Sequence, residues 1–152
     1  MSTNHKHRLD RRAGQTFKAS WLRARSGAAA VEFAFVGPLF VVILLGIMSY
    51  GGYFWLAHSV QQLANDAARA AVAGLSATER QSLAQSTIAS EISDYAFLTA
   101  SGVVTTVNTQ TNSMTVSIAY NAAQTPFFAL GSLVPMPSST ITRTATIRLA
   151  GY

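Results

Sequence analysis

The chain has 152 residues, of which 49% are hydrophobic and 11% charged, so it has room for one small domain beside a hydrophobic helix and not for a large enzyme core. It contains no cysteine, which excludes disulfides, iron–sulfur clusters and thiolate zinc sites. The net charge of +5 is confined to one end: residues 1–27 contain seven Lys or Arg and one Asp, a net +6, and residues 28–152 contain four Arg and five acids, a net −1. The basic residues therefore belong to a leader rather than to a folded nucleic-acid-binding face.

The leader and the segment after it differ sharply in polarity. Residues 1–26 are polar and basic without apolar periodicity, which predicts a disordered tail. The 25 residues Phe33–Ala57 carry no charge, and as a helix they would extend about 37 Å at ~1.5 Å per residue, against a hydrocarbon core of about 30 Å. Eleven Leu, Ile, Val or Phe residues lie between Phe33 and Met48, and they favour insertion by roughly 3 to 7 kcal/mol. We expect a transmembrane helix over residues 28–57, with Pro38 tolerated inside it.

The basic residues also predict the orientation of this helix. Arg23 and Arg25 directly precede it, whereas the first Arg beyond it is Arg69, and Lys/Arg-rich flanks stay in the cytoplasm. The N-terminus is then cytoplasmic, and everything after about Tyr53 lies on the far side. Aromatic residues agree, because they prefer the headgroup layer and cluster at both ends of the apolar run: Trp21 before it, and Tyr50, Tyr53, Phe54 and Trp55 at its exit.

Residues 58–152 read as an extracytoplasmic domain of mixed structure. Apolar residues at helical spacing extend the first helix to about Gly74, which we expect to end it; they are Val60, Leu63, Ala64, Ala67, Ala71 and Val72. Ser76 to Glu79 matches a capping box, and Leu83, Thr87, Ile88, Ile92 and Tyr95 form one stripe of a second helix. Period-two patterns then predict a hairpin, 103–107 and 114–120 around a polar turn, and a last strand over 140–149. The fold class is α+β, with an antiparallel sheet of about three strands packed on the helix.

The most informative stretch is the junction at the head of the apolar run, where Gly27 is followed by three alanines, Val31, Glu32 and Phe33. An acid beside a spanning segment is costly to insert. Glycine before the small residues would let a membrane peptidase close on bare backbone, and a cut after Gly27 would give Ala28 a new amino group. That cation could neutralise Glu32 of a neighbouring subunit. A lone acid that reaches water, or that lies near a helix N-terminus, explains Glu32 without any assembly role.

These residues resemble a known family. The run Gly27 to Phe33, the continuation Ala34-Phe35-Val36-Gly37-Pro38-Leu39-Phe40 and the aromatic exit are similar to the N-terminal segment of TadE-like (TadE/TadF) proteins. The closing strand, residues 142–148, resembles that family more weakly. Such proteins are prepilin-like minor pilins or pseudopilins of the bacterial tight-adherence (Flp pilus) system, within the type IV pilus superfamily. The resemblance covers about residues 25–73.

The resemblance implies a division of the chain and a set of partners. Residues 1–27 would be a leader removed by a prepilin peptidase between Gly27 and Ala28, and Glu32 with Phe33 would serve recognition and assembly. The expected partners are inner-membrane lipid, the peptidase, and other pilins or Tad assembly components. The protein would sit in the bacterial inner membrane as a single-pass protein, with its C-terminal domain periplasmic or extracellular, or within a pilus. It implies no enzymatic activity and no cofactor.

Other classes of protein have less support in the residues. The basic tail has no interleaved aromatic residues or reading module for nucleic acid. His5 and His7 lack the carboxylate or cysteine neighbours of a metal site, and no catalytic triad or phosphate loop is recognisable, so we expect no small-molecule substrate. The main alternative is an unprocessed, signal-anchored protein whose outer domain is a binding module. An exported protein cut after Gly51 is disfavoured, because the hydrophobic run exceeds the usual 7 to 15 residues of a signal-peptide core.

Overall fold

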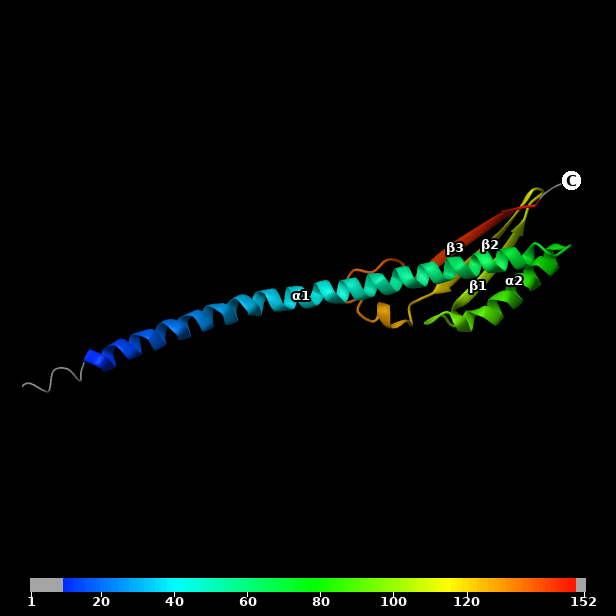
Figure 1. The fold of residues 1–152 in the computed structure, drawn as a ribbon. Helices are drawn as coiled ribbons and strands as arrows, with labels where there is room; N and C mark the ends of the chain where they lie inside the picture. The colour runs from blue at the N-terminus through cyan, green and yellow to red at the C-terminus, as the bar shows by residue number, and fades with distance from the viewer. Residues whose placement is uncertain (1–9, 150–152) are drawn as a thin grey trace, which may run out of the picture. The chain divides into compact units, whose positions relative to one another are not determined.

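The computed structural model describes residues 10–149, with side chains described from residue 27 onward. Figure 1 shows helix α1 (Asp10–Ala71), helix α2 (Ala77–Glu91) and the strands β1 (Val103–Thr109), β2 (Ser113–Asn121) and β3 (Thr140–Arg148). Three short 3₁₀ turns, η1 (Ile92–Asp94), η2 (Ala100–Gly102) and η3 (Pro126–Phe128), lie between them. The predicted α+β class is confirmed. The contacts divide the chain into two compact units, Met1–Leu44 and Leu45–Tyr152.

Part of α1 has the length and composition of a membrane-spanning helix. Within its stretch Gly27–Ala71, an 18-residue window reaches a mean hydropathy of 2.4, and none of that window is buried by the rest of the protein. This supports the candidate transmembrane helix that the sequence predicts. The tail prediction was wrong in part, because α1 begins at Asp10. Residues 10–26 contain one glycine and no proline, and they extend a helix that is already nucleated, so each added residue gains a hydrogen bond without the nucleation cost. Residues 1–9 lie outside the described range.

The sheet of the second unit is a three-stranded antiparallel meander in the order β1-β2-β3. Val103 pairs with Tyr120 at one end of the hairpin and Thr109 with Met114 at the other. β3 returns beside β2, with Asn121 opposite Thr140 and Ser113 opposite Arg148. Successive side chains of a strand point to opposite faces, so every second residue of β2 lies on the same face. That face is completely buried and consists of Met114, Val116, Ile118 and Tyr120.

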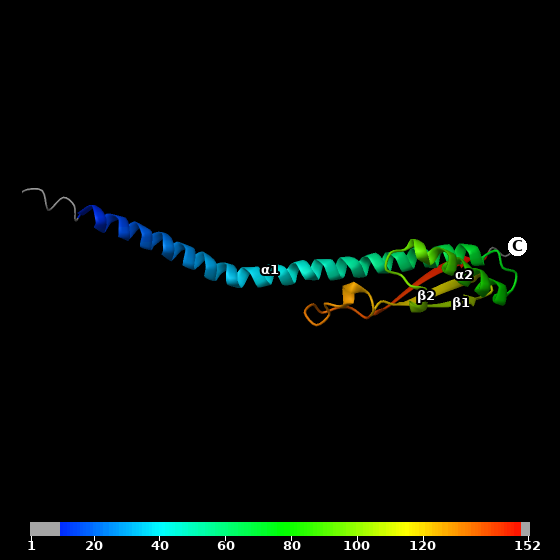
Figure 2. The ribbon, with the colours of Figure 1, turned by 90° about the horizontal axis from the view of Figure 1, so that it is seen from below.

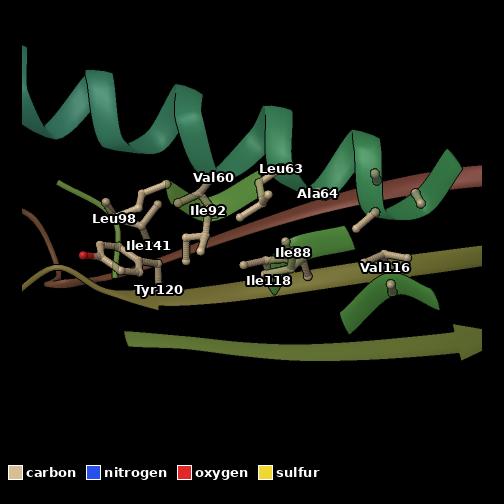
Figure 3. Close-up of a cluster of buried hydrophobic side chains, with 14 of the residues drawn as sticks. Val60, Leu63, Ala64, Ile88, Ile92, Leu98, Val116, Ile118, Tyr120 and Ile141 are labelled. Atoms are coloured by element: carbon tan, nitrogen blue, oxygen red, sulfur yellow. The ribbon is translucent and has the colours of Figure 1, made fainter. Parts of the chain in front are cut away.

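The core lies between that face and the two helices, as Figure 3 shows. Val60 and Leu63 of α1 point toward Ile118, Tyr120 and Ile141 of the sheet in this view. The same buried face of α1 also includes Leu56, Ser59 and five alanines that are fully or almost fully buried, namely Ala57, Ala64, Ala67, Ala68 and Ala71. Small side chains allow the helix axis to approach the sheet closely, so larger residues at these positions would overpack the interior.

The connection between α1 and α2 confirms one prediction and corrects two. The capping box is present: the Glu79 N–H donates to Ser76 Oγ over 3.2 Å, and Glu79 Oε2 accepts from the Leu75 N–H over 2.8 Å. However, α1 ends at Ala71, so Val72 leaves the helical stripe and is 41% exposed. Gly74 is not a left-handed cap, since no glycine among the described residues has a positive φ. Its small size serves packing instead, because a Cβ there would lie 2.8 Å from the backbone N of Arg80.

Each outer edge of the sheet is capped by a glutamine from a helix. Gln81 of α2 reaches β1, where its amide donates to the Thr105 carbonyl over 3.2 Å and accepts from the Val107 N–H over 3.0 Å. Gln61 of α1 donates to the Thr144 carbonyl of β3 over 3.1 Å. An unpaired strand edge is a template for association with another chain. The two side chains therefore provide hydrogen-bond partners for some of the unpaired backbone groups of the edge strands. They also hold each helix in register with its neighbouring strand.

Candidate assembly site

The residues at the head of the apolar run all lie inside α1 and face outward. Gly27, Ala28, Glu32 and Phe33 are exposed, and Phe33 keeps 75% of its surface accessible. A Cβ added at Gly27 would meet nothing within 4 Å. The backbone around the predicted cut is thus open to an approaching protein. The structure places these residues together on one helical segment, and their roles in processing and assembly stay predictions.

Phe33 packs against Gly37 of the same helix, whereas Glu32 stands apart from the other charged side chains that the structure describes. The ring of Phe33 lies over Gly37 one turn later, where a Cβ would be 3.4 Å from the ring. Glu32 has no ion-pair partner among the residues whose side chains are described. The side chains of Arg23 and Arg25, which the sequence assigns to topology, lie outside those residues. Among the side chains of residues 27–149, none therefore compensates the charge of Glu32.

The helix that follows exposes a continuous apolar surface. Large hydrophobic side chains from Val31 to Met48 are between 43% and 77% accessible, and they are Val31, Phe33, Phe35, Val36, Leu39, Phe40, Val41, Val42, Ile43, Leu44, Ile47 and Met48. A patch of this size is not left in water by a soluble monomer. Lipid, other helices, or both must cover it. This surface, headed by Gly27 and Glu32, is the strongest candidate for a functional site.

A hollow in the second unit has a chemistry that does not suggest catalysis. It encloses about 660 Å³ and is lined mainly by neutral side chains, including Thr99, Ser101, Asn121 and Gln124. Tyr120 is its one titratable residue, and the Tyr120 hydroxyl donates to the Phe97 carbonyl over 2.8 Å. Within residues 27–149, no group of three His, Cys, Asp or Glu side chains is placed to hold a metal ion. The hollow offers hydrogen bonds but neither a nucleophile–base pair nor a metal site.

Acidic residues gather where α1 meets the end of α2. Burial raises the pKa of Glu91, and the nearby carboxylates of Asp66 and Asp94 raise that pKa further. Burial likewise raises the pKa of Tyr95, with smaller contributions from the same three acids. Asp66 also forms an ion pair with Arg69, three residues later on α1. The two side chains approach to 4.0 Å, but both are exposed, so the pair contributes about 0.5 kcal/mol or less.

Taken together, the fold and the exposed helix define a class of protein: a candidate membrane-anchored protein with one apolar helix and a small α+β unit after it. Residues 27–69 match the family model described as TadE-like protein. The match spans 43 of the 152 residues and begins at Gly27. This confirms the resemblance seen in the sequence. That family is a pilin-like, structural family of the Tad pilus. No curated protein and no solved structure matches the chain.

Proposed function

We propose that this protein is a prepilin-like minor pilin or pseudopilin that assembles through its N-terminal helix during biogenesis of a Flp-type pilus. The observation that carries the proposal is the apolar surface of α1 from Val31 to Met48, which the rest of the chain leaves uncovered. The match to the TadE-like family starts at Gly27, directly before that surface. The function therefore lies in helix-to-helix and helix-to-lipid contacts, and the protein is not an enzyme.

In this proposal a prepilin peptidase cuts between Gly27 and Ala28. The cut removes the basic leader and leaves the amino group of Ala28 at the start of the helix. Two features support this. A Cβ at Gly27 would meet no atom within 4 Å, and the leader carries seven of the eleven Lys and Arg residues, whose charge would oppose burial of the helix end in an assembly.

Glu32 then takes part in subunit docking. The carboxylate lies four residues after Ala28, on the same face of α1, and it has no partner among the described side chains. In an assembly, the amino group of one subunit would neutralise Glu32 of its neighbour, which makes an otherwise costly charge favourable only when subunits are packed. Phe33 beside it would supply apolar contact, being exposed over 75% of its surface.

The location follows from the charge asymmetry of the sequence. Arg23 and Arg25 would hold the N-terminus in the cytoplasm, and the unit after the span would lie in the periplasm or outside the cell. The partners in this proposal are inner-membrane lipid, the prepilin peptidase, and other pilins or Tad assembly components.

The first experiment is N-terminal sequencing and intact-mass measurement of the protein from native membranes, with and without the prepilin peptidase. We expect a start at Ala28 only when the peptidase is present. Gly27→Leu should abolish the cut, whereas Gly46→Leu is the matched control, because that glycine also has no neighbour within 4 Å and lies within the apolar run. A Met1 start in peptidase-positive cells would favour the unprocessed signal anchor instead.

A second experiment separates assembly from insertion. Glu32→Ala should leave membrane insertion intact, or improve it, because a charge is removed. The same variant should lose piliation, while Glu79→Ala, which removes an acid from the distal unit, should keep it. Normal piliation in the Glu32→Ala strain would contradict the assembly role.

A further inference from the structure

The loop between β2 and β3 contains a long, largely apolar segment, Pro126–Pro137. Of its twelve residues only Ser132 has a polar side chain. The hairpin turn at the opposite end of the sheet, Asn108–Ser113, is composed entirely of Asn, Gln, Thr and Ser. The two connections at opposite ends of the sheet thus differ strongly in polarity, although neither contains a charged residue.

The apolar loop is fixed to one short stretch of α1. The Tyr50 hydroxyl donates to the Pro135 carbonyl over 2.6 Å. The ring of Phe128 lies 6.3 Å from that of Tyr53, at an interplanar angle of 64°. Phe127 occupies the space where a Cβ of Gly52 would be. Figure 2 shows the loop, in orange, running beside the helix. The loop therefore lies at the level of residues 50–53.

That level coincides with the exit of the candidate span. Residues 50–53 belong to the uncharged stretch Phe33–Ala57, and about 20 helical residues cross a hydrocarbon core. Counting from Phe33, the core boundary falls near Gly52. A loop attached to α1 at this height meets the layer where hydrocarbon gives way to headgroups.

The exposed side chains at this level suit such a layer. Leu133 at the loop is 60% exposed, and Phe54 and Trp55 on α1 are 64% and 55% exposed. Val134 is buried and Phe127 is half-buried, so both hold the loop on the protein, and Leu133 is the large hydrophobic side chain that the loop exposes. Aromatic and large aliphatic side chains of this kind gain free energy by leaving water for the interfacial region.

The backbone of the loop is also prepared for an environment poor in water. Prolines 126, 135 and 137 have no N–H to satisfy. The other nine residues each have a backbone N–H. Five of these N–H groups donate to backbone carbonyls of the loop or of the adjacent Thr125, namely those of Phe128, Ala129, Gly131, Leu133 and Val134. Unsatisfied backbone groups are costly in lipid, so this internal bonding lowers the cost of insertion.

We propose that the loop Pro126–Pro137 is a second membrane contact, which inserts Leu133 into the bilayer interface beside the end of the span. Its partner is the phospholipid bilayer, because the loop is continuous in space with the helix segment that leaves the hydrocarbon core. The inference rests on the membrane anchorage in the proposed function and goes beyond it. The contact would fix the α+β unit at the membrane surface before assembly.

The test uses the full chain in phospholipid vesicles and exploits its lack of cysteine. Three single variants, Leu133→Cys, Leu44→Cys and Leu75→Cys, are labelled with the polarity-sensitive fluorophore NBD. Leu44 lies inside the span, and Leu75, which is 93% exposed in the turn between α1 and α2, is the aqueous control. Emission wavelength and quenching are measured with lipids that carry a doxyl group near the headgroup or deep in the acyl chain.

We expect the label at residue 133 to be blue-shifted relative to residue 75 and quenched most by the shallow doxyl lipid. The label at residue 44 should be quenched most by the deep one. If residue 133 behaves like residue 75 while residue 44 is quenched, the loop contact is refuted and the anchor stands. If residue 44 is not quenched, the anchor itself fails. A blue shift at residue 133 without lipid quenching would indicate a protein contact and would also refute the inference.

Discussion

Gly51 and Gly52 are adjacent in α1 and provide a matched pair for testing how the loop docks. A Cβ at Gly52 would lie 2.0 Å from Cδ1 and 2.2 Å from Cγ of Phe127, whereas a Cβ at Gly51 would meet nothing within 4 Å. Cγ is close to the main chain, so the ring cannot move away unless the loop shifts with it. Gly52→Ala should therefore separate the loop from the helix, and Gly51→Ala should leave the packing unchanged.

The expected difference in stability can be worked from these distances. Both substitutions gain the helix preference of Ala over Gly, about 0.5–1 kcal/mol, so this contribution cancels when the two variants are compared. What remains is the overpacking at Phe127, and overpacking of this kind typically lowers the free energy of unfolding by about 1–3 kcal/mol. We expect Gly52→Ala to unfold more easily than Gly51→Ala by that amount, or by about 4 °C per kcal/mol in a unit of about 100 residues.

The assay is thermal and denaturant unfolding of the full chain in detergent micelles, followed by near-ultraviolet circular dichroism of the aromatic residues in the second unit. Gly51→Ala should match or exceed the stability of the unmodified protein. Equal midpoints for Gly51→Ala and Gly52→Ala would refute the reasoning, because they would mean that Phe127 does not occupy the space over Gly52.

Three further predictions concern the second unit, and each is checked by unfolding of the full chain in micelles. Ser76→Ala removes the acceptor at the start of α2 and should cost about 1 kcal/mol, whereas Ser76→Asn should keep most of the stability; equal losses would argue against the cap. Tyr120→Phe keeps the buried ring but leaves the Phe97 carbonyl without its 2.8 Å donor, so we expect a loss of about 0.5–1.5 kcal/mol and no change in the sheet by circular dichroism. Glu91 has a folded-state pKa above its ordinary value of 4.5, so the native state binds the proton more tightly than the unfolded state. Stability should therefore fall as the pH rises from about 4.5 through the folded-state pKa. Glu91→Gln should accordingly stabilise the protein at pH 7, with the gain shrinking to nothing below about pH 4; a gain that is constant over this range would contradict the effect.

Local patterns in the sequence were enough to predict much of this fold. The capping box at Ser76 and Glu79 involves four consecutive residues, and the hairpin shows an alternation that only one sheet face can bury. The candidate span needs only an uninterrupted apolar run, which is why composition alone indicates it. The junction from Gly27 to Phe33 was also visible in the sequence, and its family resemblance was confirmed over residues 27–69.

Where prediction from sequence failed, the deciding cause lay outside the local pattern. The apolar stripe of α1 includes Val72, but the helix ends at Ala71 because the chain turns there toward α2. Gly74 looks like a helix cap, yet its role is to let Arg80 approach. The leader lacks apolar periodicity, but residues 10–26 are helical as an extension of α1.

The sequence by itself determined the apolar helix, the basic leader, the polarity of the two sheet ends and the kinds of elements that follow, since each depends on neighbouring residues. Only the tertiary structure decided that the loop Pro126–Pro137 lies against α1 near Tyr50, or that Gln61 and Gln81 cap opposite edges of one sheet. These contacts join residues that are 24 to 85 positions apart. Their geometry depends on how closely an alanine-lined helix can pack on the sheet, and no local pattern contains that information.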